Sequence, residues 1–218
     1  MSVEEQDKII LIDKPTGWTS FDVVKKIRNC LGIRKVGHAG TLDPLATGLL
    51  ILCTGKKTKE INEIQEMEKE YIGEFTLGQI TDSFDLETPV KFVSNCKNVT
   101  PDSVIETTKK FVGTVDQIPP AFSAIKVEGK RAYLKARKGE KQSIQPRKVT
   151  LYSFEILKIE IPLIAFKVIC SKGTYIRSLA NDFGNEIGAG AYLSRLKRTR
   201  IGTYNLEDAA TIEQICLQ

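Results

Sequence analysis

The chain has 218 residues, of which 41% are hydrophobic and 27% charged, and this composition is typical of a globular protein of one large or two small domains. No apolar run reaches the roughly 18–20 residues of a membrane-spanning helix. The acidic start, MSVEEQDK, lacks the basic-then-apolar order of a signal peptide. These features exclude a helical membrane protein and predict a cytoplasmic one.

The first half of the chain is predicted to form a buried strand over 8–12, a helix that Thr19 or Ser20 caps and Gly32 ends, a buried strand over 49–53, a short helix over 57–67 and a half-exposed strand over 71–77. The second half is predicted to form a helix that opens at Thr100 and Pro101, a strand pair over 149–160 and 165–171, a helix over 174–187, a final strand over 199–204 and a short tail. Strands outnumber helices and come in hairpin-like groups. This favours an α+β fold with a mixed, mostly antiparallel sheet flanked by helices and loops.

No internal repeat or low-complexity linker divides the chain, so we expect residues 1–218 to form a single domain. The segment 128–147 is polar and basic with little periodicity, and we expect a long mobile loop there, because such loops in compact domains are usually functional. The five cysteines form no C-x-x-C pair, and most stand beside apolar stretches. We expect reduced, buried thiols, and with one histidine the sequence indicates no zinc site.

The segment GHAGTLDPLATG, residues 37–48, carries the strongest functional signal. Pro44 disfavours a helical residue before it, so Asp43 should lie in extended backbone on a loop. The three glycines permit turns or close backbone approach. The loop therefore presents one carboxylate and the chain's only histidine, His38, although a tight structural turn could use similar residues.

The net charge of +5 is unevenly distributed. Nine basic and two acidic residues lie between Lys126 and Lys148, and a second basic cluster holds Arg195, Lys197, Arg198 and Arg200. Separate basic clusters predict a polyanion as partner, with RNA or DNA the obvious candidate. A solvated basic face is the alternative.

Three further motifs leave more than one interpretation. Thr54–Thr58 resembles the end of a phosphate-binding loop, but the required first glycine and the final Ser or Thr are missing. Arg177 stands in the first turn of a helix, where a cation is disfavoured, so we expect a carboxylate partner such as Asp43, or else an ordinary surface arginine. Periodicity alone favours a core role over a stacking platform for Tyr71.

Together these pieces resemble the bacterial-type tRNA pseudouridine-55 synthases over nearly the whole chain. The motifs that carry the resemblance are LIDKPTG at 11–17, GHAGTLDPLATG at 37–48, KEY at 69–71, LGQ at 77–79 with Thr81 and Asp85, PPAFSAIK at 119–126, SKGTYIR at 171–177, residues 193–198 and GTY at 202–204. Two departures are a threonine, Thr88, where many relatives have glycine, and the end of the chain soon after Tyr204. The latter predicts that the C-terminal PUA-type RNA-binding domain of many relatives is absent.

The resemblance implies a pseudouridine synthase fold and the isomerisation of uridine 55 in the T loop of tRNA, without cofactor or metal. By position, it implies that Asp43 acts on the ribose as nucleophile or base, that Arg177 pairs with it, and that Tyr71 stacks on the flipped base. It places His38, Tyr175, Leu196 and Lys14 at or beside the nucleotide, and we add Lys126 and Arg198 as candidate RNA contacts.

We also expect a monomer that acts without a protein partner or a membrane, with 128–147 as the segment that closes on the RNA. An RNA-binding or tRNA-folding protein with secondary catalysis is the alternative.

Overall fold

The computed structural model describes residues 7–217 apart from 124, 128 and 141. The chain divides into two compact units. Unit 1 comprises Met1–Ile72 and Arg195–Gln218, and unit 2 comprises Gly73–Ser194. Strands β4 (Lys69–Leu77) and β12 (Ala191–Ile201) run from one unit into the other, so each unit holds a part of both.

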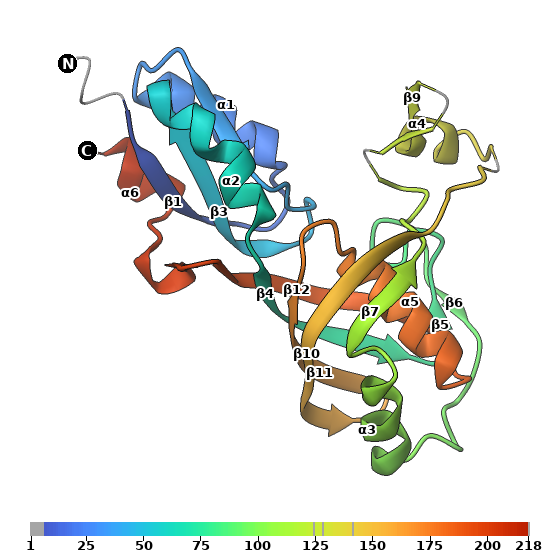
Figure 1. The fold of residues 1–218 in the computed structure, drawn as a ribbon. Helices are drawn as coiled ribbons and strands as arrows, with labels where there is room; N and C mark the ends of the chain where they lie inside the picture. The colour runs from blue at the N-terminus through green and yellow to red at the C-terminus, as the bar shows by residue number, and fades with distance from the viewer. Residues whose placement is uncertain (1–6, 124, 128, 141, 218) are drawn as a thin grey trace. The chain divides into compact units, whose positions relative to one another are not determined.

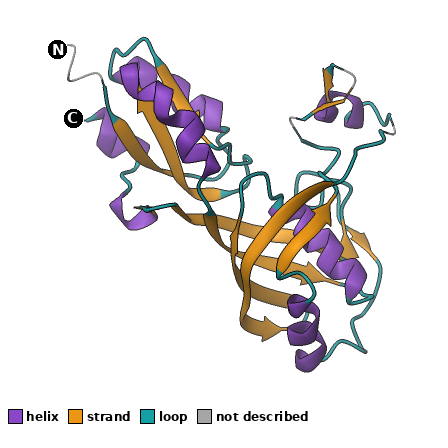
Figure 2. Cartoon of the chain, viewed as in Figure 1, coloured by secondary structure: helices purple, strands orange, loops and turns teal. Residues whose placement is uncertain are grey.

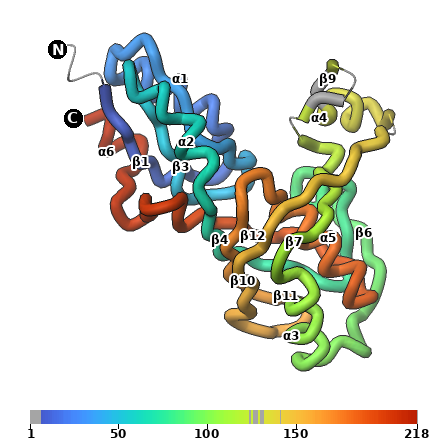
Figure 3. Tube along the Cα trace, in the orientation of Figure 1, coloured from blue at the N-terminus to red at the C-terminus, as the bar shows by residue number. Residues whose placement is uncertain are grey.

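Unit 1 is built around β3 (Thr47–Thr54), whose middle and end are buried without interruption. Strand β3 pairs antiparallel with β1 (Ile9–Lys14) and β2 (Val36–Ala39), and parallel with β12. Figure 3 shows that the first and last parts of the chain lie together in this unit. A short β13 (Tyr204–Asn205) folds back on the end of β12.

Three helices pack on these strands. The first is α1 (Ser20–Cys30), which Figures 1 and 2 show beside the strands of this unit. It begins in a capping box in which Thr19 and Asp22 satisfy each other's backbone N–H groups. The chain continues from β3 into a 3₁₀ helix (Gly55–Glu60) and α2 (Ile61–Glu66). After β13, a second 3₁₀ turn (Leu206–Asp208) leads to α6 (Ile212–Cys216), which contacts α1.

Unit 2 contains a sheet in the order β12–β4–β11–β10–β7. Strand β10 (Arg147–Glu160) pairs antiparallel with β11 (Leu163–Cys170) and with β7 (Gly113–Gln117). Helices α3 (Pro101–Lys109) and α5 (Ile176–Glu186) contact each other, and α3 also contacts β10. The smaller elements are the pair β5 (Gln79–Ile80) and β6 (Lys91–Phe92), the pair β8 (Lys126–Val127) and β9 (Lys130–Arg131), and α4 (Ala132–Ala136).

Each unit has its own apolar core. In unit 1, buried aliphatic residues of β2, β3, α2 and β12 form one cluster: Ala39, Leu49, Ile51, Cys53, Ile64 and Ile201. In unit 2, five phenylalanines pack edge-to-face, tilted or stacked: Phe75, Phe111, Phe154, Phe166 and Phe183. Aromatic side chains bury the largest area per residue, so this cluster is a main source of stability in unit 2.

The α+β fold with a mixed sheet is confirmed, and each predicted helix and strand has a counterpart. Three expectations were wrong. The loop at 37–48 is shorter, because β2 and β3 take up both of its ends. The final strand runs over 191–201 instead of 199–204, since Gly202 turns the chain with a φ of +53°. The segment 128–147 is not structureless, because it contains β9 and α4; its mobility stays a prediction.

The expectation of five reduced cysteines was also wrong. Cys30 at the end of α1 and Cys216 at the end of α6 form a disulfide with a Cα–Cα distance of 5.4 Å. Cys53, Cys96 and Cys170 are buried and lie outside this disulfide, as expected. Sequence reasoning missed the pair because it placed no helix in the C-terminal tail. In the described part of the chain, no helix is both long and apolar enough to cross a membrane.

Candidate active site

Asp43 lies on the loop between β2 and β3, outside regular secondary structure and half-buried. Its carbonyl accepts a hydrogen bond from the Ala46 N–H at 3.1 Å, which closes a turn over Pro44. Beside it, the Ser20 hydroxyl on α1 accepts from the Leu42 N–H at 2.9 Å and donates to the Leu42 carbonyl at 3.1 Å. Both backbone polar groups of Leu42 are thus bonded to α1, which fixes the loop at the residue before Asp43.

Arg198 on β12 holds the same loop from inside the protein. It is 1% exposed, and its guanidinium donates to the carbonyls of Leu49 at 2.8 Å, Gly40 at 2.9 Å and Thr41 at 3.4 Å. Gly48 lets β12 come this close: its φ is +95°, and a Cβ there would lie 2.3 Å from the Arg198 carbonyl oxygen. The predicted RNA contact by Arg198 does not fit this burial, so we reassign the residue to support of the Asp43 loop.

Lys14, the last residue of β1, is fully buried and supports the other side of the loop. Its ammonium donates to three carbonyls, those of Pro15 at 2.9 Å, Trp18 at 2.8 Å and Pro44 at 3.4 Å. Burial lowers the pKa of Lys14 to about 8; the Asp43 carboxylate opposes this shift and Arg198 adds to it. The charge of Lys14 thus lies within electrostatic reach of Asp43, while its hydrogen bonds shape the backbone.

His38 is on β2, before the loop, and half-buried. Its Nε2 lies 3.1 Å from the Thr41 hydroxyl. Burial, and then the charge of Arg198, lower the pKa of His38 below its usual value. The imidazole is therefore neutral near pH 7, which suits a hydrogen bond or a packing contact better than attraction of a phosphate.

Tyr71 and Leu196 lie on the two long strands, within unit 1. Tyr71 on β4 is 8% exposed, which agrees with the periodicity and leaves its stacking role a prediction. Leu196 on β12 is half-buried, and its carbonyl accepts a hydrogen bond from the Thr47 hydroxyl at 3.4 Å. This bond ties the strand of Leu196 to the start of β3, where the Asp43 loop ends.

Arg177 in unit 2 is 3% exposed, so it is not a surface arginine. Its Nε lies 3.6 Å from the Asp85 carboxylate, and its Nη1 donates to the carbonyls of Phe122 at 3.2 Å and Ser83 at 3.4 Å. The expectation of a carboxylate partner is thus confirmed, with Asp85 as a partner that the sequence analysis did not assign to Arg177. The pairing of Arg177 with Asp43 stays a prediction.

Tyr175 is the N-cap residue of α5, and two side chains from neighbouring strands hold it. The guanidinium carbon of Arg147 lies 4.9 Å from the centre of its ring, a cation–π contact. The carboxamide of Gln117 bonds its backbone. Sequence reasoning missed both: Arg147 was only the last residue of the basic segment, and nothing local marks Gln117.

The basic clusters divide into exposed and internal members. On β12, Arg195 and Lys197 are exposed, whereas Arg200 forms an ion pair with Glu68 at 2.8 Å. The alternation follows from the period of two along a strand, which places neighbours on opposite faces. The side chain of Lys126 lies outside the described residues, so its RNA contact stays a prediction.

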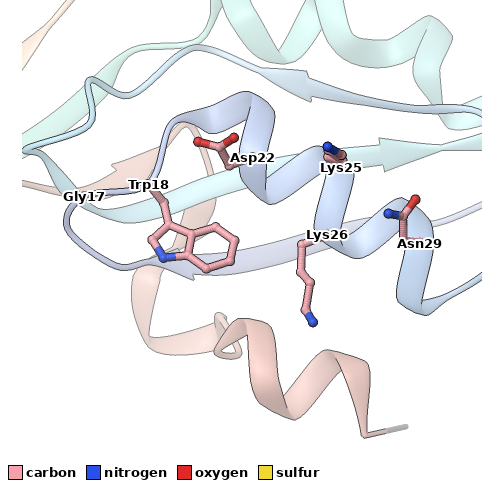
Figure 4. Close-up of a pocket in the computed structure, with 6 residues that line it drawn as sticks. All are labelled: Gly17, Trp18, Asp22, Lys25, Lys26 and Asn29. Atoms are coloured by element: carbon pink, nitrogen blue, oxygen red, sulfur yellow. The ribbon is translucent and has the colours of Figure 1, made fainter.

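A shallow pocket of about 400 Å³ lies on α1, and Figure 4 shows its lining: Gly17, Trp18, Asp22, Lys25, Lys26 and Asn29. The Trp18 ring and the Lys26 side chain extend from the same side of α1. The charged lining residues are exposed, and none of the candidate site residues lines the pocket, so we assign it no chemistry. Among the described residues, no group of three or more histidines, cysteines and acids could hold a metal ion.

Comparisons with known proteins agree with this picture. The family model described as TruB family pseudouridylate synthase (N terminal domain) matches residues 28–176. A tRNA pseudouridine synthase B of Flavobacterium johnsoniae is 49% identical and covers 97% of this chain and 96% of that protein. One of Parabacteroides distasonis is 50% identical over 95% of this chain and 91% of that protein.

Two solved structures resemble the fold over 99% of the chain. One is a crystal structure of a Cbf5–Nop10–Gar1 complex, with a TM-score of 0.77 and 30% identity. The other is an H/ACA RNP bound to a substrate RNA containing 2′-deoxyuridine, with a TM-score of 0.74 and 29% identity. This chain spans 56% and 55% of those chains. Its motifs, its α+β fold and these matches establish that the chain belongs to the TruB family of pseudouridylate synthases.

Proposed function

We propose that this protein converts uridine 55 in the T loop of tRNA to pseudouridine, with Asp43 acting on the ribose of a flipped-out uridine. The observation that carries this proposal is the fixed loop around Asp43, in which α1, β1 and β12 supply hydrogen bonds to the backbone on both sides of the carboxylate. A reactive group held in this way loses little freedom when it reacts. The relatives named tRNA pseudouridine synthase B support the choice of substrate.

The reaction breaks the bond from C1′ to N1 and forms one from C1′ to C5, after which C5 loses its proton and N1 gains one. An ionised carboxylate can attack C1′ or remove a ribose proton, and either step requires a fixed approach to the sugar. A uridine in a folded loop must leave the stack to be reached. Tyr71 would stack on the flipped base, and neutral His38 would help to hold the nucleotide.

Binding of the tRNA backbone needs cations that the phosphates can reach. Arg195 and Lys197 are exposed and could contact phosphates, as could Lys126 and other basic residues of 128–147. We propose that the protein acts in the cytoplasm, where tRNA is found, as a monomer and without a protein partner or bound cofactor.

The test is release of tritium from tRNA labelled at C5 of its uridines, measured with purified protein. The wild-type protein should release label from a tRNA transcript, and not from a transcript in which cytidine replaces uridine 55. Asp43→Asn should abolish release while tRNA binding persists, because the substitution removes the reacting charge and keeps the shape.

Asp102→Asn on α3 is the matched control and should behave as wild type, because Asp102 is exposed in unit 2. Full activity of Asp43→Asn would overturn the assignment of the catalytic residue. Tight tRNA binding without release by the wild-type protein would support an RNA-binding or tRNA-folding protein instead.

A further inference from the structure

Gln117, the last residue of β7, places its carboxamide against the backbone of Tyr175. The residue is 2% exposed. Its Nε2 donates to the Tyr175 carbonyl at 3.1 Å, and its Oε1 accepts from the Tyr175 N–H at 2.7 Å. Because both bonds go to one residue, they fix the direction of the chain there as well as its position.

Tyr175 is where α5 begins, and the first N–H groups of a helix have no partner inside the helix. A Ser, Thr, Asp or Asn side chain at the N-cap usually compensates for this, but Tyr175 forms no side-chain cap. Its carbonyl accepts from the Leu179 N–H at 3.0 Å as the helix starts. Gln117 on β7 therefore provides side-chain hydrogen bonds at the start of α5, where the N-cap residue itself provides none.

The segment after Gln117 holds the same turn of α5. The Ile118 carbonyl accepts from the Ser178 hydroxyl at 2.7 Å, and the Phe122 carbonyl accepts from Arg177 Nη1 at 3.2 Å. Residues 117–122 thus bond the backbone of Tyr175 and the side chains of the second and third helical residues. Of these contacts, only those of Gln117 depend on the identity of the side chain in that segment.

We propose that Gln117 is a positioning residue for pseudouridine formation, acting through Tyr175 and Arg177 and never touching the RNA. The inference rests on the proposed function and on the roles that the family resemblance implies for those two residues. A small rotation of the α5 start would move the Tyr175 ring and the Arg177 guanidinium together, and misplacement of catalytic groups by about 1 Å can cost a hundredfold in rate.

Two substitutions separate this role from a merely structural one. Gln117→Met keeps the length of the side chain and removes both hydrogen bonds to Tyr175. Gln117→Glu keeps an acceptor for the Tyr175 N–H, but when ionised it sets a carboxylate oxygen against the Tyr175 carbonyl. When protonated, the same carboxyl group restores a donor at the place of Nε2.

For Gln117→Met we expect single-turnover conversion of tRNA to fall by between about tenfold and a hundredfold, with tRNA affinity within about threefold of wild type. Hydrogen exchange of the peptide that contains Tyr175 and Leu179 should become faster, which reports on positioning independently of activity. Ile164→Val is the control, since it removes a buried methyl group on β11 and should lower stability without changing the conversion rate.

For Gln117→Glu we expect the rate relative to wild type to rise as the pH falls from about 8 to about 6, because burial favours the protonated carboxyl. Gln117→Met should show a flat ratio. The charged groups around this position come from α5, the end of α3 and strands β7 and β10: Asp182, Glu186, Lys110, Asp116 and Arg147. The same pH profile of the rate, measured with Asp116→Asn added to Gln117→Glu, tests whether Asp116 causes the pH dependence.

Unchanged exchange at Tyr175 in Gln117→Met would overturn the positioning role, and so would faster exchange with a wild-type rate. The positioning role would also be overturned if Gln117→Met lost no more of its conversion rate than Ile164→Val does at equal stability. If the wild-type protein forms no pseudouridine in tRNA, the proposed function fails and the catalytic part of this inference fails with it. The exchange result then still decides whether Gln117 anchors α5.

Discussion

At the scale of single residues, two buried cations of unit 1, Lys14 and Arg198, serve the backbone of the Asp43 loop. Lys14 and Arg198 come from opposite ends of the chain, and each donates to carbonyl oxygens that a loop would otherwise leave unsatisfied. A buried carbonyl without a partner costs about 1–3 kcal/mol. The two side chains therefore make a tightly curved loop stable enough to hold a carboxylate.

Lys14 gives the stability of the protein a defined pH dependence. Its pKa is about 8 in the folded protein and close to 10.5 when unfolded, so between these values the unfolded state binds more protons. The contribution of Lys14 to the free energy of unfolding therefore rises with pH between these two values. In urea titrations, we expect the difference in free energy of unfolding between wild type and Lys14→Met to grow from pH 8 to pH 10.

Lys26→Met, in an exposed position on α1, is the control and should show no such growth. A difference between wild type and Lys14→Met that is independent of pH would contradict the buried, proton-releasing lysine.

Arg198 and Lys197 are neighbours on β12 with opposite expected phenotypes. Arg198→Met should lower the free energy of unfolding by about 1–3 kcal/mol and slow conversion of tRNA, because the loop carbonyls lose their donors. Lys197→Met should leave the melting temperature unchanged and weaken tRNA binding, with a shallower dependence on salt. Calorimetry and tRNA binding at several salt concentrations measure both effects. If Arg198→Met weakened tRNA binding and Lys197→Met lowered stability instead, Arg198 would again be assigned to the RNA-binding surface.

Sequence reasoning works at this scale where the chemistry is local. The glycines and Pro44 around Asp43 predict a loop from conformational restrictions that act within two residues. The direction of the Arg198 side chain is not local, since its partners lie 149 to 158 residues away. Charge along the sequence therefore cannot separate Arg198, which points inward, from Lys197, which points outward.

At the scale of elements, the disulfide between α1 and α6 has a measurable effect. A bridge between residues 186 positions apart restricts the unfolded chain strongly, and native disulfides typically contribute about 2–4 kcal/mol. The Cys216→Ser variant should therefore melt at a lower temperature than the oxidised wild-type protein. Its melting temperature should equal that of the wild-type protein in dithiothreitol. A wild-type melting temperature that does not respond to the reductant would show that the bridge does not form or does not stabilise.

Elements with strong local signals were predictable, and those defined by partners were not. The helices α1 and α3 begin in capping boxes next to a periodic apolar face. Strand β2 has four residues without alternation and exists because β3 pairs with it. Helix α6 has five residues, too few to show a period, and packs on α1.

At the scale of the whole molecule, the fold class was predictable because the ratio and grouping of strands determine it. The division into two units was not. No linker separates them, since β4 and β12 each contribute to both, and unit 1 is assembled from the first and last segments of the chain. A change of composition can mark a domain boundary where a linker joins two consecutive domains. Here the chain passes into unit 2 and back into unit 1 within strands, so the sequence shows no such change.

The bridge from Cys30 to Cys216 closes nearly the whole polypeptide into a covalent ring. A protease that cuts once within the basic segment 128–147 would open this ring without releasing a fragment. The two pieces would stay joined through α1 and α6 and would separate on an electrophoresis gel only after reduction. Under oxidising conditions, the two segments of unit 1, residues 1–72 and 195–218, would thus stay covalently linked in a nicked molecule, which could refold as one molecule.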